Sequence, residues 1–205
     1  MRLGLITDVH EDVDHLKRSL EALQGQRIDR LVLLGDVCHM SERLEETVAM
    51  LAEAQAEGVW GNHDFGLCDK PINELRDDYS AGLLRFMRGL APRLEIEGCL
   101  FTHVEPWLDP TRLEDLWWFE GMPDTPARVG QSLAAYKNRV MFIGHFHRWF
   151  AATAEGPIEW RGEAPLVLRP DCRYLIGVGA VCEGWCGVFD TDQARLTPIN
   201  VRVKS

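Results

Sequence analysis

The sequence lacks a hydrophobic run long enough to cross a membrane, and its basic residues are few. The apolar stretch nearest its start, Leu3 to Ile6, is followed closely by Asp8 and is too short for a signal-peptide core. Its 22 Lys and Arg are outnumbered by 32 Asp and Glu, which gives a formal net charge of -10. This charge argues against a broad nucleic-acid-binding face and means that an anionic substrate needs a local cation. We expect a cytoplasmic protein with no membrane partner.

Cysteine is also too sparse to form a disulfide framework. Six cysteines in 205 residues do not make the dense pattern of a small secreted domain, so reduced thiols are the default. Cys182 and Cys186 have the spacing of half a zinc site, but no second cysteine pair follows them. Most of the cysteines are expected to be small buried side chains. Repeats and low-complexity segments are absent too, and the length predicts one domain over residues 1–205.

What the sequence does contain is a series of short apolar runs, each followed by side chains that can bind a metal ion. The run from Leu31 to Leu34 is long enough for a buried strand, and it leads through Gly35 to Asp36. A buried carboxylate needs a cation, a cap or a turn to offset its desolvation. Turn chemistry alone can explain Gly35 and Asp36. We nevertheless consider Asp36 a candidate ligand shared by two metal ions, because four other strand ends carry similar residues.

Those four strand ends supply the remaining candidate ligands. The run at 3–7 is followed by Asp8 and His10, that at 58–60 by Gly61, Asn62, His63 and Asp64, that at 99–102 by His103, and that at 140–143 by His145 and His147. Residues two apart on an extended segment point to the same side, so the paired residues can face one cavity. At residues 61–64 a turn needs only the Gly, the Asn and the Asp, which leaves His63 unexplained.

Helical patterns separate these strands. After Asp12, a good N-cap, Leu16, Leu20 and Leu23 recur at helical spacing, and the segment 41–55 carries a similar apolar stripe. Alternating strands and helices predict a parallel sheet with a site beyond the carboxyl ends of its strands. We also expect 71–90 to be mostly helical, and 94–102 to form two strands and a turn. Short strands at 149–153, 166–168, 174–181, 187–189 and 196–203 predict a second, largely antiparallel sheet.

The segment 104–136 is predicted to be irregular and rich in aromatic surface. Its interruptions are Pro106, Pro110, Pro123 and Pro126, and its large aromatic side chains are Trp107, Trp117, Trp118 and Phe119. We place a substrate lid here. The alternative is that the tryptophans pack a long loop onto the core.

Taken in order, the motifs Asp8-x-His10, Gly35-Asp36, Gly61-Asn62-His63-Asp64, His103 and Gly144-His145-x-His147 resemble those of the calcineurin-like metallophosphoesterase family. The C-terminal half is similar to its small bacterial and archaeal branch. The resemblance implies an α/β fold, a two-sheet β-sandwich flanked by helices, with a dinuclear metal site at the C-terminal ends of the strands. It assigns one metal to Asp8, His10, Asp36 and His147, and the other to Asp36, Asn62, His103 and His145. It also makes His63 a proton donor and Asp64 its orienting partner.

The implied activity is that of a metal-dependent phosphoesterase. Its mixed oxygen and nitrogen ligands suit two divalent ions of Mn, Fe or Zn, which would hold a bridging hydroxide in line with phosphorus. The substrates would be small phosphomonoesters or phosphodiesters, with nucleotides among the candidates. The rival is a non-catalytic metal-binding scaffold of the same fold that recruits protein partners. The residues His63 and Asp64 favour catalysis, whereas an apolar patch around the tryptophans would favour the scaffold.

Some positions depart from the family pattern. Residues 37–40 lack the Asp-Arg-Gly sequence typical of the protein-phosphatase branch, so an arginine fork for phosphate is missing there. Val104 stands where a glycine is common, and Ala180 follows Gly179 where serine is commoner. Protein phosphatase activity is therefore not expected, although all the implied metal ligands are present.

Overall fold

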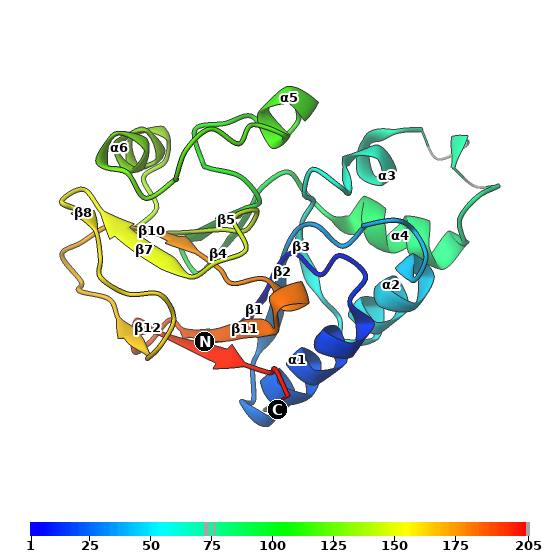
Figure 1. Cartoon of the computed structure of the whole chain (residues 1–205), viewed down its shortest axis with the longest axis horizontal. Coiled ribbons are helices and arrows are strands. Elements are labelled where there is room, and N and C mark those ends of the chain that lie inside the picture. Colours follow the sequence, from blue (N-terminus) through cyan, green and yellow to red (C-terminus); the bar gives the residue numbers. More distant parts are fainter. Residues whose placement is uncertain (72–73, 76, 204–205) are drawn as a thin grey trace.

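Two mixed six-stranded sheets form the centre of the molecule, with helices on the outer face of each (Figure 1). The computed structural model describes residues 1–71, 74–75 and 77–203. Across the first sheet the strands are β3 (Glu57–Val59), β2 (Arg30–Leu34), β1 (Arg2–Ile6), β11 (Trp185–Asp190), β12 (Arg195–Asn200) and β9 (Leu166–Val167). Across the second they are β4 (Leu94–Ile96), β5 (Cys99–Thr102), β6 (Val140–Ile143), β10 (Tyr174–Gly177), β7 (Phe150–Thr153) and β8 (Gly156–Pro157). The predicted sandwich is confirmed.

The helices are distributed over the two outer faces. They are α1 (Val13–Gly25), α2 (Leu44–Glu53), α3 (Phe65–Asp69), α4 (Ala81–Gly89), α5 (Leu113–Leu116) and α6 (Pro126–Ala135), with a short 3₁₀ turn η2 (Val181–Glu183). Helices α1, α2 and α4 cover the first sheet, and α6 covers the second (Figure 1). The order of layers is therefore helices, sheet, sheet, helix.

Alternating side chains of β2 show how one strand serves two cores. Leu31 and Leu33 pack against the helices of the first layer, whereas Val32 and Leu34 face the second sheet. Successive residues of a strand point to opposite faces, so a fully apolar strand must be covered on both sides. Burying each such side chain contributes about 1.5–3 kcal/mol. The continuous apolar run thus fixes β2 in the interior and delivers its end to the edge of the sandwich.

Helix starts follow from local capping. Asp12 caps α1, because its Oδ1 accepts the backbone N–H of His15 at 3.0 Å. Ser80 caps α4 in the same way, accepting from Leu83 at 3.1 Å. The prediction of a mostly helical segment over 71–90 is therefore wrong before Ser80, where the described residues form turns. Residues 72, 73 and 76 of that prediction lie outside the described part of the chain.

The strands after residue 147 do not form a separate antiparallel sheet, so that prediction is wrong. β7 and β8 join β10 in the second sheet, and β10 itself pairs in parallel with β6. β11 pairs with β1 instead, and β12 and β9 continue the first sheet. Both β1 and β6 would otherwise leave a row of unpaired backbone groups beside a buried core, and the C-terminal strands satisfy both rows.

The segment 104–136 is more regular than predicted. It contains α5 and, from Pro126, the ten-residue helix α6. Pro126 lies in the first turn of α6, where a missing backbone N–H leaves no helical hydrogen bond unmade. The proline therefore begins a helix, although the sequence analysis treated it as an interruption.

Two expectations about side chains and membranes can be compared with the structure. All six cysteines are free thiols, and five of them are buried, as expected. In the described part of the chain, no helix combines the length and apolar character needed to cross a membrane.

Candidate metal centre

The carboxyl ends of five strands meet at one edge of the sandwich. β1, β2 and β3 run parallel in the first sheet, and β5 and β6 run parallel in the second. The backbone N–H of His145 donates across the junction to Asp8 Oδ2 at 3.1 Å. His103 Nδ1 donates in the other direction to the carbonyl oxygen of Leu34 at 2.7 Å. The site therefore lies where the two sheets join, and not at the end of one parallel sheet.

One group of candidate ligands consists of Asp8, His10 and His147, whose ligand atoms all lie within 4.8 Å of one another. His147 Nε2 is 3.3 Å from Asp8 Oδ1. His10 Nε2 lies 3.2 Å from His147 Nε2 and 3.7 Å from Asp36 Oδ2. These are the residues that the family resemblance places around the first metal.

A second group contains Asp36, His103 and His145. Asp36 Oδ2 is 3.3 Å from His103 Nε2. Asn62 Oδ1 completes the group, at 3.0 Å from both His103 Nε2 and His145 Nδ1. Because Asp36 Oδ2 also lies close to His10, this carboxylate stands between the two groups. All seven predicted ligands are thus brought together.

The carboxylates create a strongly negative local field. Burial alone would raise the pKa of Asp36, but the charge and hydrogen bond of His103 hold it below its usual range. Conversely, burial would lower the pKa of His103, yet the charge of Asp36 raises it to about 9. The close approach of the Asp8 carboxylate raises the pKa of His147 to about 10. His145, in contrast, is dominated by its burial, which lowers its pKa to about 4. Both groups therefore attract positive charge.

Several polar atoms at this edge of the sandwich lack hydrogen-bond partners or point at the carboxylates, as the ligands of a metal ion would. Asp8 Oδ1 and His145 Nε2 are buried and have no hydrogen-bond partner in the described residues. His10 and His103 each donate Nδ1–H to a backbone carbonyl oxygen, which leaves Nε2 directed at the carboxylates. Ligating histidines are typically held in this way, and orphaned buried acceptors are costly without a cation. The donor set of carboxylates, amide and imidazoles suits Mn, Fe or Zn. The residues present therefore fit a divalent metal centre.

The backbone at the same residues is strained. Five of the seven candidate ligands have positive φ, namely Asp8 (49°), His10 (46°), Asp36 (56°), His145 (66°) and His147 (56°). Each such conformation costs a non-glycine residue about 1–3 kcal/mol. Surrounding hydrogen bonds must offset that cost, and strain of this kind clusters at functional sites.

Glycine is required where β2 reaches the site. Gly35 has a φ of +92°, and a Cβ atom there would lie 2.6 Å from the backbone nitrogen of Gly61 and 2.7 Å from His103 Nδ1. Any side chain would push the ligand-bearing loops apart. The Gly35-Asp36 motif is thus explained by close approach as well as by the turn.

His63 and Asp64 lie next to the candidate ligands in different ways. His63 lines the site, with its ring 4.9 Å from that of His10, and its backbone N–H donates to Asp36 Oδ1. Asp64 is fully buried, and its Oδ1 accepts the backbone N–H groups of Val37 and Cys38. Its Oδ2 accepts that of Gly61 at 2.9 Å. Asp64 therefore joins the loops after β2 and β3, and its predicted role as the partner of the His63 ring stays a prediction.

A cavity of about 520 Å³ opens beside these ligands. Its lining consists of His10, Asp36, His39, Asn62, His63, Trp117, Phe119, His145, His147 and Cys182. No role in this site was predicted for His39 or Cys182. Cys182 follows β10, and its Sγ lies 3.7 Å from His147 Nδ1. β10 also ends at this edge, because it pairs in parallel with β6. That pairing was not predicted, so the residues after β10 were not considered for the site.

The tryptophans of 104–136 divide into two kinds. Trp107 and Trp118 meet edge to face at 4.9 Å and pack with the buried Leu108 and Leu116. Trp117 instead lines the cavity, with 52 % of its surface exposed. Two of the three tryptophans, Trp107 and Trp118, therefore pack the segment onto the protein, which was the alternative prediction.

A two-sheet sandwich with such a cluster at its strand ends is the architecture of metallophosphoesterases. The chain belongs to the calcineurin-like phosphoesterase superfamily, whose domain model matches residues 1–170. An uncharacterized protein of Methanocaldococcus jannaschii is 24 % identical over 197 residues, which cover 87 % of this chain and 75 % of that protein.

Solved structures share the fold. A metallophosphoesterase from Sphaerobacter thermophilus superposes with a TM-score of 0.80 at 22 % identity, over 100 % of this chain and 89 % of that one. An archaeal phosphodiesterase gives a TM-score of 0.56 at 14 % identity, over 98 % and 99 % of the two chains. At these identities the likeness extends to the fold alone.

Proposed function

We propose that this protein is a metal-dependent phosphoesterase that hydrolyses small phosphomonoesters or phosphodiesters, with nucleotides among its candidate substrates. The observation that carries the proposal is the convergence of seven ligand-type side chains at one edge of the sandwich, among them Asp8, whose buried Oδ1 has no hydrogen-bond partner in the described residues. Membership of the superfamily supports the phosphoester bond as the target. The archaeal relative of the same fold is a phosphodiesterase, which supports diesters as one of the two classes.

Two divalent ions would occupy this edge. Asp8, His10, Asp36 and His147 would hold one, and Asp36, Asn62, His103 and His145 the other. When bound, the ions would neutralise phosphoryl oxygens and lower the pKa of a water molecule for attack on phosphorus. This would supply the positive charge that a protein of net charge -10 otherwise lacks.

The chain's own residues would complete the chemistry. His63 faces the cavity and would give a proton to the departing oxygen, as a general acid near neutral pH does. Asp64 would act as a positioning residue, because its three backbone hydrogen bonds hold the loops that carry Asp36 and His63. The segment 104–136 would bind the rest of the substrate, since Trp117 and Phe119 contribute to the cavity lining.

The test is a comparison of p-nitrophenyl phosphate with bis(p-nitrophenyl) phosphate. Chelator-treated protein should be inactive on both, and Mn²⁺, Fe²⁺ or Zn²⁺ should restore turnover of at least one. The ratio of the two rates would assign monoesterase or diesterase preference. No turnover with any of the three metals, at confirmed metal loading, would refute the proposed hydrolysis.

One observation favours the rival scaffold. Leu113, Trp117, Phe119 and Met122 are all exposed large apolar side chains on one segment, as a partner-binding patch would be. A scaffold would bind metal normally and remain inert toward every phosphoester. Hydrolysis that depends on His63 would exclude it.

A further inference from the structure

Two aromatic side chains stand exposed at the mouth of the metal-site cavity. Trp117 is 52 % exposed and Phe119 61 % exposed, and both line the cavity. Trp118, between them, points away and packs against Trp107. This alternation places two large apolar surfaces in water beside ligand-type residues. A bound ring system would cover both.

The two aromatic rings lie beside different histidines of the site. The ring of Trp117 lies 5.0 Å from that of His63. The ring of Phe119 lies 5.2 Å from that of His145 and stacks on Phe146 with an angle of 23° between their planes. A flat group attached to a phosphoryl group at the metal ligands would therefore have two aromatic side chains of the lining available for stacking.

Arg128 holds this segment in position. Its Nε donates to Glu105 Oε1 at 2.8 Å, and a second nitrogen pairs with the other oxygen of the same carboxylate. Another nitrogen donates to the carbonyl oxygen of Glu120, and the guanidinium lies 4.4 Å from the centre of the Trp118 ring. The Glu120 carbonyl and the Trp118 ring, on either side of Phe119, are thus held by Arg128 before any ligand arrives, which lowers the entropy cost of binding.

The charge of the cavity lining limits the number of phosphate groups that a bound ligand can carry. Among the described residues that line it, none is Lys or Arg. At the Cys182 side, Glu183 places Oε1 3.7 Å from His147 Nδ1, which adds negative charge near the opening. One phosphoryl group would be neutralised by the ions at the metal ligands, but further phosphates would meet no Lys or Arg side chain of the lining and would lie closer to Glu183.

We infer that Trp117 and Phe119 form a stacking subsite. It selects phosphoesters that carry one phosphoryl group and a planar, uncharged ring system, such as a nucleoside monophosphate. Aliphatic phosphoesters and nucleoside di- or triphosphates bind more weakly. The inference rests on the proposed function for the position of the phosphoryl group, and it adds the substrate class.

Binding of nonhydrolysable analogues to the Mn²⁺-loaded protein tests the subsite without requiring turnover. The ligands are the phosphonate analogue of AMP, the methylene-bridged analogue of ATP, and methylphosphonate, followed by calorimetry and by tryptophan fluorescence. The AMP analogue should bind at least 10-fold more tightly than either other ligand and should quench fluorescence. Trp117→Leu and Phe119→Leu should each weaken it by about 5- to 150-fold, the range for loss of one base–aromatic stack. Methylphosphonate affinity should not change.

Leu113→Ala is the matched control, because Leu113 is exposed on α5 but does not line the cavity. Its affinities should equal those of the parent. Equal affinity for the AMP analogue and methylphosphonate, or an ATP analogue bound as tightly as the AMP analogue, would overturn the inference. Selective binding of the AMP analogue without any hydrolysis would keep the subsite and refute the proposed function. Hydrolysis with KM values unchanged in both aromatic variants would refute the subsite alone.

Discussion

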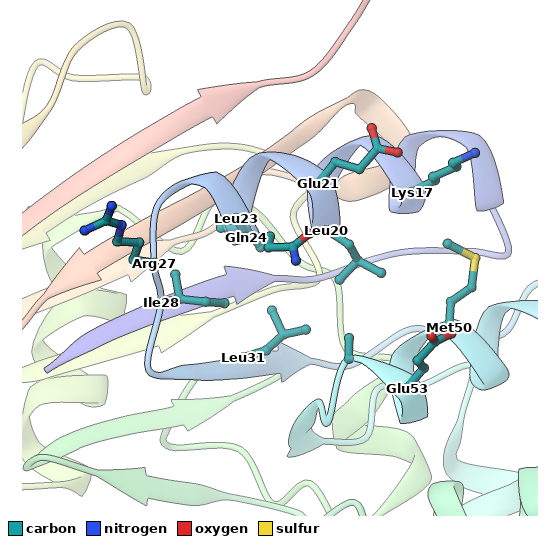
Figure 2. Close-up of a pocket in the computed structure, with 11 residues that line it drawn as sticks. Lys17, Leu20, Glu21, Leu23, Gln24, Arg27, Ile28, Leu31, Met50 and Glu53 are labelled. Atoms are coloured by element: carbon teal, nitrogen blue, oxygen red, sulfur yellow. The ribbon is translucent and has the colours of Figure 1, made fainter.

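Two hollows of comparable volume on this protein differ in the chemistry of their linings. A groove of about 630 Å³ between α1 and α2 exceeds the metal-site cavity of about 520 Å³ (Figure 2). Its apolar surface comes from Leu20, Leu23, Ile28, Leu31 and Met50, and its charged lining residues are Lys17, Glu21, Arg27 and Glu53. None of these described side chains except Leu23 and Leu31 is buried, so the charged groups are hydrated at little cost. The larger hollow is an ordinary junction of two amphipathic helices.

The metal-site cavity, in contrast, is formed by residues whose backbone conformation and burial cost free energy. Five of its candidate ligands have left-handed backbone, whereas in the groove Arg27 alone of the described lining does so, just beyond the end of α1. Orphaned polar atoms, Asp8 Oδ1 and His145 Nε2, lie at the cavity and not at the groove. Volume is therefore a poor guide to chemistry in this molecule. Strained backbone at five candidate ligands, together with the unpaired atoms of Asp8 and His145, distinguishes the site from the groove.

The largest expected contrast comes from removing one carboxylate in each hollow. Asp36→Asn should weaken binding of both metal ions and lower kcat/KM at least as much as loss of acid catalysis does, by ~10²–10⁴-fold. Glu53→Gln in the groove, also a loss of one negative charge, should change neither. Elemental analysis and metal titration decide the point. Loss of one ion with the other's affinity unchanged would count against a shared ligand.

The substitution His63→Ala tests whether a residue of the cavity lining donates a proton. Esters with alkoxide leaving groups should slow by ~10²–10⁴-fold, and p-nitrophenyl esters much less, because p-nitrophenolate leaves without a proton. His15→Ala on α1, which does not line the cavity, is the control. With metal content equal in all proteins, a uniform loss of kcat across leaving groups would refute proton donation.

Asp64→Asn should act mainly on stability. An amide can accept fewer of the three backbone hydrogen bonds and carries no charge, so the free energy of unfolding should fall by about 1–3 kcal/mol in urea titrations. The dependence of its kcat on the leaving group should equal that of the parent protein. If the variant instead copied the leaving-group profile of His63→Ala with unchanged stability, Asp64 would be an orienting partner of the ring after all.

The smallest effect is expected at the groove. Lys17→Gln replaces an exposed charge there and should alter the free energy of unfolding by less than about 0.5 kcal/mol. Its kcat/KM should match the parent's within error. A drop in activity at unchanged stability would break the comparison, because it would give the groove a functional role.

The sequence was informative wherever local pattern decides the structure. Apolar runs predicted β1, β2, β5 and β6, and the polar residues after them predicted which side chains would converge. The partners of Asp64 could not be predicted, since its three hydrogen bonds depend on how two loops approach each other. Nor could the sheet joined by each C-terminal strand, because pairing between distant strands is set by tertiary packing. Trp117 and Trp118 differ only in direction, which adjacency in sequence does not reveal.

The pairing of β1 has a consequence for how the chain folds during synthesis. β1 lies between β2 and β11, so one of its two neighbours is among the first strands made and the other among the last. The backbone N–H of Cys182 also donates to the carbonyl oxygen of Asp8. At ~5–20 residues per second, β11 leaves the ribosome roughly 10–40 s after β1. Asp8 is thus translated early but gains its hydrogen bond from Cys182 late, so the candidate metal centre is complete only when the C-terminal strands dock.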